Sequence, residues 1–239
     1  AGAIRCASPS EAAKDVDVLL LCVSDDAAVE AVLFGAGGAT KGLRPGCVVL
    51  DCSTISPAQA IHCAERLGRL GVSYLDAPVT GGTEGAKAGS LTVLVGGEAS
   101  AFHQVQPVLE VIGGTVHHFG AVGRGQQVKA VNQVLVAGSY AAVAEAMALG
   151  QRLELPMQQV VQALKGGAAG SWALNHRAEG MLEGKYPLGF KLALHHKDLG
   201  IALSCAESAQ LELPISKLVQ QQEAQLMREG HGDDDVSAL

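Results

Sequence analysis

Unbroken apolar runs alternate with helical stretches in the first half of the chain. The runs cover residues 17–23, 46–52 and 72–78, and helical patterns over 25–34 and 57–67 separate them. A strand that is apolar on both faces fits a parallel sheet with helices on both sides, whereas a half-exposed strand alternates apolar and polar residues. This order therefore predicts an α/β domain built on a buried parallel sheet.

The pattern changes after Gly123, where strand-like runs stop. Before that point, strands are predicted at 90–97 and 115–119, with a helix at 99–111 between them. The predicted helices beyond it cover residues 125–153, 171–183, 191–210 and 215–229, with a further helix beginning after Pro156. An α/β run followed by a helical run predicts two domains, and we place their boundary near Gly120.

Two helix starts carry specific capping chemistry. Ser8 and Ser56 each precede a proline and are followed three residues later by Glu11 or Gln59. Serine at the N-cap, proline at the first helical position and Glu or Gln at the third satisfy the free N–H groups of a first turn. The sequence therefore predicts helices that begin at residues 9 and 57.

The stretch DAPVTGGTEGAKAGSLTVLVGG, residues 76–97, holds six glycines between two predicted strands. Glycine loses more backbone freedom on folding than any other residue, so such a cluster marks turns or close approach to another group. One interpretation is a tight hairpin or crossover loop with left-handed backbone angles. The other is a loop whose bare N–H groups hold an anion. Composition leaves both open.

Charge and composition argue against several classes of partner. The formal net charge is −7 over 239 residues, which leaves no basic stripe to follow the phosphates of a nucleic acid. The longest apolar run, 18–23, is too short to span a bilayer, so we expect no membrane partner. The six cysteines follow no zinc-binding spacing and the histidines include adjacent pairs, which point apart, so we expect no metal site and a reducing, cytoplasmic setting.

A polar stripe runs along the long predicted helix. Helical spacing places Lys129, Asn132 and Gln133 on one face, whereas neighbouring positions such as Val131 and Leu135 are apolar. We therefore expect a largely buried helix with a polar seam. A buried lysine is costly unless it is paired or used, and burial lowers the pKa of a lysine toward the range of proton transfer. The alternative is that Lys129 lies at a domain edge and reaches water along its aliphatic stem.

Three segments occur in an order that resembles a known family. DAPVTGG (76–82) is similar to a DxPVSGG element with Thr80 in place of serine, and GRGQQVKAVNQ (123–133) is similar to a GxGxxxKxxNN element with Gln133 in place of the second Asn. GFKLALHHKDLGIAL (189–203) carries a KDL element. Together they resemble the β-hydroxyacid dehydrogenase family, which includes 3-hydroxyisobutyrate dehydrogenase. Within it, the Asn-Gln pair and GGAAGS (166–171) look closest to the tartronate semialdehyde reductases.

The resemblance implies an oxidoreductase that uses NAD or NADP to interconvert a small β-hydroxy acid and its semialdehyde or oxo acid. It implies that residues 1–120 are a partial Rossmann-type dinucleotide-binding domain without its first βαβ unit. Residues 121–239 would be an all-helical substrate and dimerisation domain that begins with a long interdomain helix. The chain starts at Ala1 rather than Met and holds no Gly-x-Gly-x-x-Gly, so we expect a truncated sequence that binds dinucleotide poorly by itself.

The family's functional residues carry over by position. Lys129 would be the general acid/base, and Asn132 would hydrogen-bond the substrate and fix its orientation. The substrate carboxylate would be bound by N–H groups and a hydroxyl of Thr80, Gly81 and Gly82, with a further substrate contact or a helix cap from Ser171. The cofactor would be bound by Val23, Ser24, Thr54 and Lys197, although Thr54 also fits ordinary turn chemistry and Lys197 a solvated helix residue.

The main alternative to an enzyme is a non-catalytic relative that keeps the fold as a dinucleotide- or metabolite-binding module. The presence of Lys129, Asn132 and the predicted carboxylate cradle (Thr80–Gly82) together favours catalysis. Several substrates with a carboxylate close to the reacting carbon remain open: tartronate semialdehyde, 3-hydroxyisobutyrate, succinic semialdehyde and glyoxylate. Apolar helix faces predict a homodimer or homotetramer. The acidic ending GDDDVSAL is interpreted as a solvated tail, although Asp235 and Ser237 resemble family residues near the active site.

Overall fold

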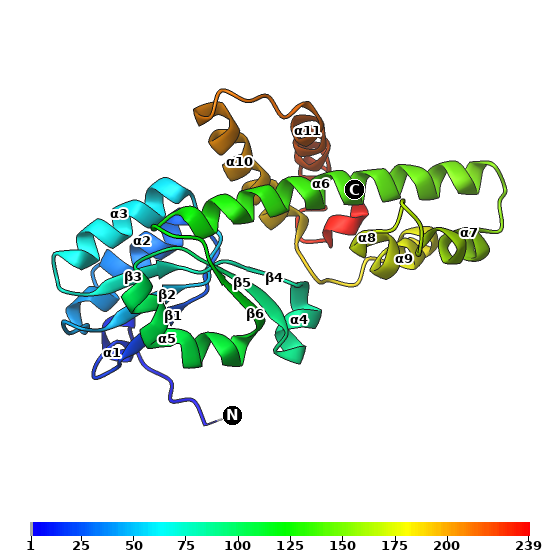
Figure 1. Cartoon of the computed structure of the whole chain (residues 1–239). Helices are drawn as coiled ribbons and strands as arrows, with labels where there is room; N and C mark the ends of the chain where they lie inside the picture. Colours follow the sequence, from blue (N-terminus) through cyan, green and yellow to red (C-terminus); the bar gives the residue numbers. More distant parts are fainter. Residues whose placement is uncertain (1) are drawn as a thin grey trace. The chain divides into compact units, whose positions relative to one another are not determined.

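The computed structural model describes residues 2–239 (Figure 1). The chain divides into two compact units, Ala1–Lys129 and Ala130–Leu239, which we call the sheet unit and the helical unit. The division falls inside the long helix α6 (Arg124–Arg152), so the first turn and a half of this helix belongs to the sheet unit. The units are described separately below.

A parallel sheet forms the first half of the sheet unit (Figure 1). Its strands lie in the order β1 (Val18–Leu21), β2 (Val48–Asp51) and β3 (Ser73–Asp76). The last residue of β1 pairs in register with Asp51, and Asp51 pairs with Asp76, so the carboxyl ends of these strands meet at one edge. The predicted strands and their parallel arrangement are confirmed.

Helices cover both faces of this sheet, as the unbroken apolar runs indicate. One face is covered by α2 (Asp26–Phe34) and α3 (Pro57–Gly68), and the other by α5 (Ala99–Ile112). Val49 shares a core with the first pair of helices, whereas Val48 and Leu50 share a core with α5. Successive residues of one strand point to opposite faces, so a strand between two helical layers has to be apolar throughout.

Strand β1 is an edge strand. Within the described residues it pairs on one side only, with β2, and its Leu20 side chain is 44% exposed. An apolar strand edge of this kind offers free N–H and C=O groups for pairing with another strand.

The glycine-rich stretch contains short elements that the sequence does not predict. β4 (Val79–Thr80) pairs antiparallel with β5 (Leu91–Val95), which runs parallel to β6 (Gly113–His118). Between β4 and β5 lies α4 (Gly82–Ala88). A two-residue strand and a seven-residue helix of small residues are too short to show a period in the sequence. A bridge between Asp76 and Gly96 joins this sheet to the first.

Both predicted capping serines are confirmed. The Ser8 hydroxyl oxygen accepts a hydrogen bond from the Glu11 N–H at 3.2 Å and begins α1 (Pro9–Ala12). The Ser56 hydroxyl oxygen accepts one from the Gln59 N–H at 3.1 Å and begins α3. These contacts fix where the chain turns from loop into helix.

The helical unit contains the rest of α6 and, along the chain, α7 (Met157–Leu164), α8 (Trp172–His176), α9 (Ala178–Glu183), α10 (Leu192–Ser208) and α11 (Pro214–Arg228). The expectation of a largely buried α6 is wrong, because Val131 is 63% exposed and Leu135 is 69% exposed. By length and composition alone α6 also qualifies as a membrane span, although a core helix of a soluble protein passes the same test.

The chain ending is buried rather than solvated, so that interpretation is wrong. Asp235 is fully buried and Ser237 nearly so. The Asp235 carboxylate accepts hydrogen bonds from the N–H groups of Gly189 and Phe190 at 2.8 and 2.9 Å, and from the Ser237 hydroxyl at 2.6 Å. These bonds fasten the last residues to the loop that leads into α10. Composition conceals this, because Asp233 pairs with Lys191 and Asp234 with His231 near the surface, whereas Asp235 alone of the three is buried.

Candidate active site

Three of the predicted cofactor residues lie at the carboxyl edge of the parallel sheet. Val23 and Ser24 follow β1, and Thr54 follows β2. The two loops are tied together, because the Val23 N–H donates to the Ser53 hydroxyl at 2.9 Å. Dinucleotides bind at this edge of open α/β sheets, so the residues fit a nicotinamide cofactor.

A buried carboxylate ends each of the strands β2 and β3. Asp51 accepts hydrogen bonds from the Tyr74 hydroxyl at 2.8 Å and from the Ser53 N–H at 2.9 Å. Burial raises the pKa of Asp51 above its usual value, and the bonds from Ser53 and Tyr74 offset only part of that rise. Burial, with the Asp51 charge beside it, raises the pKa of Tyr74 well above its usual value. This pair fixes the start of the loop that carries Thr54.

Asp76 holds the beginning of α6. Its carboxylate accepts hydrogen bonds from the N–H groups of Gly123 at 2.7 Å and Gln126 at 2.9 Å, which are free donors at a helix start. Burial raises the pKa of Asp76, and these two hydrogen bonds oppose the rise. Asp76 therefore acts as an N-cap supplied from a distant strand, and a negative charge there also suits the helix dipole.

Gln126 connects the same helix to the loop after β2. Its side-chain NH2 donates to the Ser53 carbonyl oxygen at 2.8 Å, and its carbonyl oxygen accepts the Ile55 N–H at 3.2 Å. Thr54 lies between these two anchored residues. Hydrogen bonds therefore connect the predicted cofactor loop to the helix that carries Lys129 within the sheet unit.

Lys129 lies beside the predicted carboxylate cradle. Its ammonium group donates to the Val79 carbonyl oxygen at 2.9 Å, and the side chain is 7% exposed. Lys129 is the last residue of the sheet unit, so the domain-edge part of the alternative holds, but its buried side chain does not reach into water as that alternative also expects. Val79 directly precedes Thr80, Gly81 and Gly82, so the structure brings the predicted acid/base to the predicted substrate loop.

The first two glycines of the cradle have backbone angles that favour glycine. Gly81 has φ of +130° and Gly82 has φ of +65°, both in the region that other residues rarely adopt. Of the two interpretations of this stretch, the turn geometry is present. Both glycines are also exposed, as a ligand-binding loop requires.

A chain of polar side chains connects α6 and α10 in the helical unit. The Asn132 amide NH2 donates to the Gln133 carbonyl oxygen at 2.6 Å, and the Gln133 NH2 donates to Asp198 at 2.7 Å. The Lys197 ammonium pairs with the other oxygen of Asp198 at 2.9 Å. The structure therefore links Asn132, a predicted substrate residue, to Lys197, a predicted cofactor residue.

Comparisons with known proteins match both units. Residues 1–120 match the family described as the NAD-binding domain of 6-phosphogluconate dehydrogenase, and residues 123–239 match the family described as NAD-binding of NADP-dependent 3-hydroxyisobutyrate dehydrogenase. The 2-hydroxy-3-oxopropionate reductase of Escherichia coli is 38% identical over 92% of this chain and 75% of its own. The chain belongs to the β-hydroxyacid dehydrogenase family. Its members are NAD(P)-dependent oxidoreductases, so the cofactor is NAD or NADP.

Further relatives have different names. An L-threonate dehydrogenase from Cupriavidus necator is 37% identical over 100% of this chain and 81% of its own. A crystal structure of 3-hydroxyisobutyrate dehydrogenase from Salmonella typhimurium has a TM-score of 0.89 and 33% identity, covering 97% of this chain and 81% of its own. These matches confirm the predicted family and the predicted order of an α/β domain before a helical domain.

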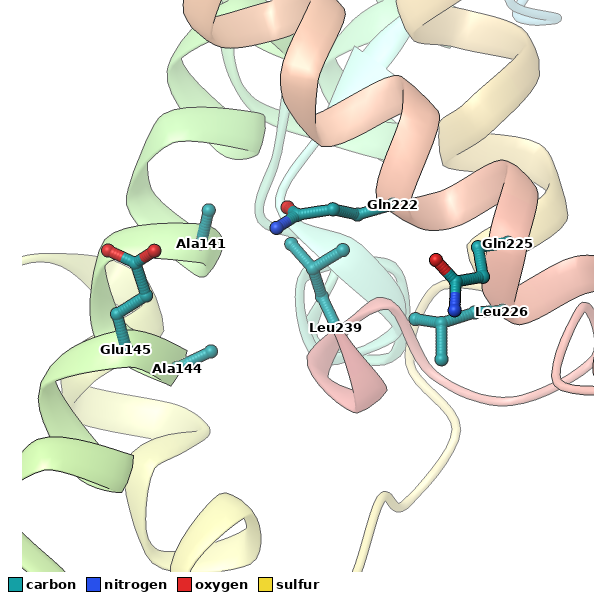
Figure 2. Close-up of a pocket in the computed structure, with 7 residues that line it drawn as sticks. All are labelled: Ala141, Ala144, Glu145, Gln222, Gln225, Leu226 and Leu239. Atoms are coloured by element: carbon teal, nitrogen blue, oxygen red, sulfur yellow. The ribbon is translucent and has the colours of Figure 1, made fainter. Parts of the chain in front are cut away.

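Other features of this β-hydroxyacid dehydrogenase lie apart from the predicted residues. The Ser171 hydroxyl oxygen accepts the Leu174 N–H at 3.0 Å, so it caps α8. A cavity of about 240 Å³ in the helical unit is lined from α6, α11 and the chain end by Glu145, Gln222 and Leu239 with neighbouring residues, and none of the predicted site residues lines it (Figure 2). Within residues 2–239, no cluster of three His, Cys, Asp or Glu side chains is placed to hold a metal ion.

The sequence reasoning missed the residues that support the site. Asp76 and Gln126 lie in the segments DAPVTGG and GRGQQVKAVNQ, where the resemblance assigns roles only to other residues: Thr80, Gly81, Gly82, Lys129 and Asn132. Asp51 and Asp76 could have been found as charged residues that end apolar strands, because a carboxylate in such a position has to be hydrogen-bonded. Asp198 follows Lys197 in the KDL element, and its side of the helix could not be fixed without knowing the partner helix.

Proposed function

We propose that this chain interconverts a small β-hydroxy acid and its semialdehyde or oxo acid. NAD(P)H supplies a hydride to the carbonyl carbon of the substrate, and NAD(P)+ accepts it in the reverse direction. The observation that carries the proposal is the buried Lys129 ammonium, held by the Val79 carbonyl at the edge of the Thr80–Gly82 loop. A non-catalytic module has no need of a buried lysine at this place.

Lys129 completes the proton balance of the reaction. In reduction its ammonium gives one proton to the carbonyl oxygen as the carbon gains the hydride, so the product is a neutral hydroxyl and the lysine is left as an amine. In oxidation the amine takes that proton back. A positioned acid/base of this kind contributes about 10²–10⁴-fold to a rate.

The substrate carboxylate is assigned to the Thr80 hydroxyl and to the backbone N–H groups of Gly81 and Gly82. Exposed N–H groups in a turn suit an anion because they carry partial positive charge and need no side chain. Asn132 is assigned to the substrate, and Ser171 to a further substrate contact. Val23, Ser24, Thr54 and Lys197 are assigned to the cofactor. The domain limits 1–120 and 121–239 are proposed as the dinucleotide-binding and the substrate and dimerisation domains.

A substrate panel tests the proposal in the full-length protein. Tartronate semialdehyde, succinic semialdehyde and glyoxylate are reduced with NADH or NADPH, and glycerate and 3-hydroxyisobutyrate are oxidised with NAD+ or NADP+, all followed at 340 nm. We expect turnover of at least one pair, and loss of turnover when the carboxylate is replaced by a carboxamide. Dinucleotide binding without turnover of any compound would instead support the non-catalytic module.

We further propose a homodimer or homotetramer in the cytoplasm. Exposed apolar side chains on α6 and α11 support assembly: Val131, Leu135, Ile215 and Leu218. Free thiols at every cysteine of the described chain suit a reducing compartment. Light scattering after size exclusion tests the first point, since a monomer would contradict it. Cell fractionation tests the second and, because α6 qualifies by composition as a membrane span, must include the membrane pellet.

A further inference from the structure

The hydrogen bonds from Asn132 to Lys197 have a fixed direction. A carboxylate only accepts hydrogen bonds, so Asp198 obliges Gln133 to turn its NH2 toward it. The carbonyl oxygen of Gln133 then faces Asn132, and Asn132 has to present its own NH2 there. The amide orientation of Asn132 is therefore set by Asp198, with which it is connected through the Gln133 side chain.

The orientation decides what Asn132 offers to a ligand. With its NH2 donating to Gln133, its Oδ1 is not used in any hydrogen bond within residues 2–239. Asn132 is half-buried and its Oδ1 is not one of the buried polar atoms that lack a partner within the described residues, whereas the Gln133 and Asp198 side chains are buried. The chain thus presents a hydrogen-bond acceptor at a position that the proposed function assigns to the substrate.

Proton balance indicates which substrate group can donate a hydrogen bond to the Asn132 Oδ1. The reacting hydroxyl has a single proton, and that proton passes to Lys129. An acceptor at Asn132 is therefore matched by a different donor on the substrate. Glycerate carries such a donor, a second hydroxyl on the carbon next to the carboxylate. In 3-hydroxyisobutyrate a methyl group stands in its place.

We propose that Gln133 and Asp198 are positioning residues that hold the Asn132 oxygen toward a donor group on the carbon next to the substrate carboxylate. The inference rests on the proposed function. It makes this chain selective for 2-hydroxy substrates such as glycerate and its semialdehyde over 2-methyl substrates of the same size. Lys197 supports the arrangement, since its ammonium pairs with the second oxygen of Asp198 and is itself only a donor.

The variant Asp198→Asn reverses the direction of the hydrogen bonds that connect residue 198, Gln133 and Asn132. Lys197 keeps the amide oxygen of the new side chain on its own side, so the amide NH2 faces Gln133. Gln133 turns its carbonyl oxygen toward that NH2 and its own NH2 toward Asn132. Asn132 then presents two N–H donors to the ligand and no acceptor. The double variant Gln133→Glu/Asp198→Asn restores the direction, because a carboxylate at 133 accepts from both neighbours.

The experiment compares kcat/KM for oxidation of glycerate and of 3-hydroxyisobutyrate in wild type, Asp198→Asn and the double variant. We expect a wild-type preference for glycerate of about tenfold or more, as one matched hydrogen bond provides. Asp198→Asn should lose most of this preference, because glycerate oxidation should fall more than 3-hydroxyisobutyrate oxidation does. The double variant should recover a preference for glycerate that is within about threefold of the wild-type preference.

The outcomes separate this inference from the proposed function. Turnover of neither acid would count against the proposed function. Turnover of both with no preference in wild type, or with an unchanged preference in Asp198→Asn, would overturn the inference alone. If Asp198→Asn does not fold, as judged by circular dichroism, the double variant decides, because it rebuilds the same direction. A folded double variant that has lost the glycerate preference would then overturn the inference.

Discussion

Replacing Gly125 with alanine tests how closely α6 approaches the sheet beneath it. A Cβ at this position would lie 2.2 Å from the Leu94 carbonyl oxygen and 2.8 Å from the Asp76 carboxylate. Ordinary contacts of a Cβ are longer than 3.4 Å, so the overlap with Leu94 exceeds 1 Å. The first contact is with backbone, which cannot rotate away, so the helix start has to shift.

Two opposing effects set the size of the change. Alanine is favoured over glycine within a helix by about 1 kcal/mol. Overpacking of a tight site costs about 1–3 kcal/mol, and more where backbone has to move. The shift also lengthens the bonds from Gly123 and Gln126 to Asp76, each of which contributes about 1.5–3 kcal/mol as a bond to a charged group. We therefore expect Gly125→Ala to lower the free energy of unfolding of the sheet unit by about 2–4 kcal/mol.

Gly138→Ala is a matched control on the same helix. Apart from its own helix and chain neighbours, no heavy atom of the described residues lies within 4 Å of a Cβ built there. This variant should raise stability by up to about 1 kcal/mol, since only helix propensity acts. Differential scanning calorimetry measures both, and the sheet-unit transition in Gly125→Ala should fall by about 7–15 °C. A Gly125→Ala protein as stable as Gly138→Ala would refute the close-approach reasoning.

Three further predictions concern buried polar groups. Tyr74→Phe removes a donor to the buried Asp51 carboxylate and should cost about 1–3 kcal/mol in urea unfolding, whereas the exposed Tyr186→Phe should be neutral. Burial raises the pKa of Asp235, but the hydrogen bonds from Ser237, Phe190 and Gly189 outweigh burial and lower the pKa below its usual value. The stabilisation by Asp235 is therefore present above about pH 4 and is lost as pH falls through the lowered pKa. Asp235→Asn should have a lower free energy of unfolding than wild type at pH 7, and that free energy should depend less steeply on pH in acid; equal slopes for the two proteins would contradict this. Burial raises the pKa of Cys52 and of Cys63 to about 12, so mass spectrometry should find these thiols the slowest to react with iodoacetamide at pH 8 in the folded protein, a protection that urea should abolish.

The strands and their parallel arrangement were predictable because they depend on patterns that each segment carries itself. Buried strands such as β2 are apolar on both faces, and Ser56 predicts the start of the next helix because it is a local N-cap. The glycine stretch was not predictable in this way. β4 and α4 exist because the chain pairs with β5, a contact that no local pattern contains.

The site was partly predictable for a similar reason. Lys129 and the Thr80–Gly82 loop could be assigned because their spacing matches the family's motifs. The supporting bonds from Asp76 to α6 and from Asp198 to Gln133 join residues far apart in sequence, so they appear only in the folded chain. Burial of Asp235 was mistaken for solvation because composition cannot distinguish a paired carboxylate from an exposed one.

The central claim is that the Lys129 amine moves the proton in this reaction. Lys129→Met, similar in length but without an ionisable group, tests it in a single-turnover reduction at saturating dinucleotide with the substrate identified by the panel. We expect the rate to fall by about 10²–10⁴-fold while dinucleotide affinity, measured by NADH fluorescence, stays unchanged. A rate within about threefold of wild type would contradict the acid/base role of Lys129.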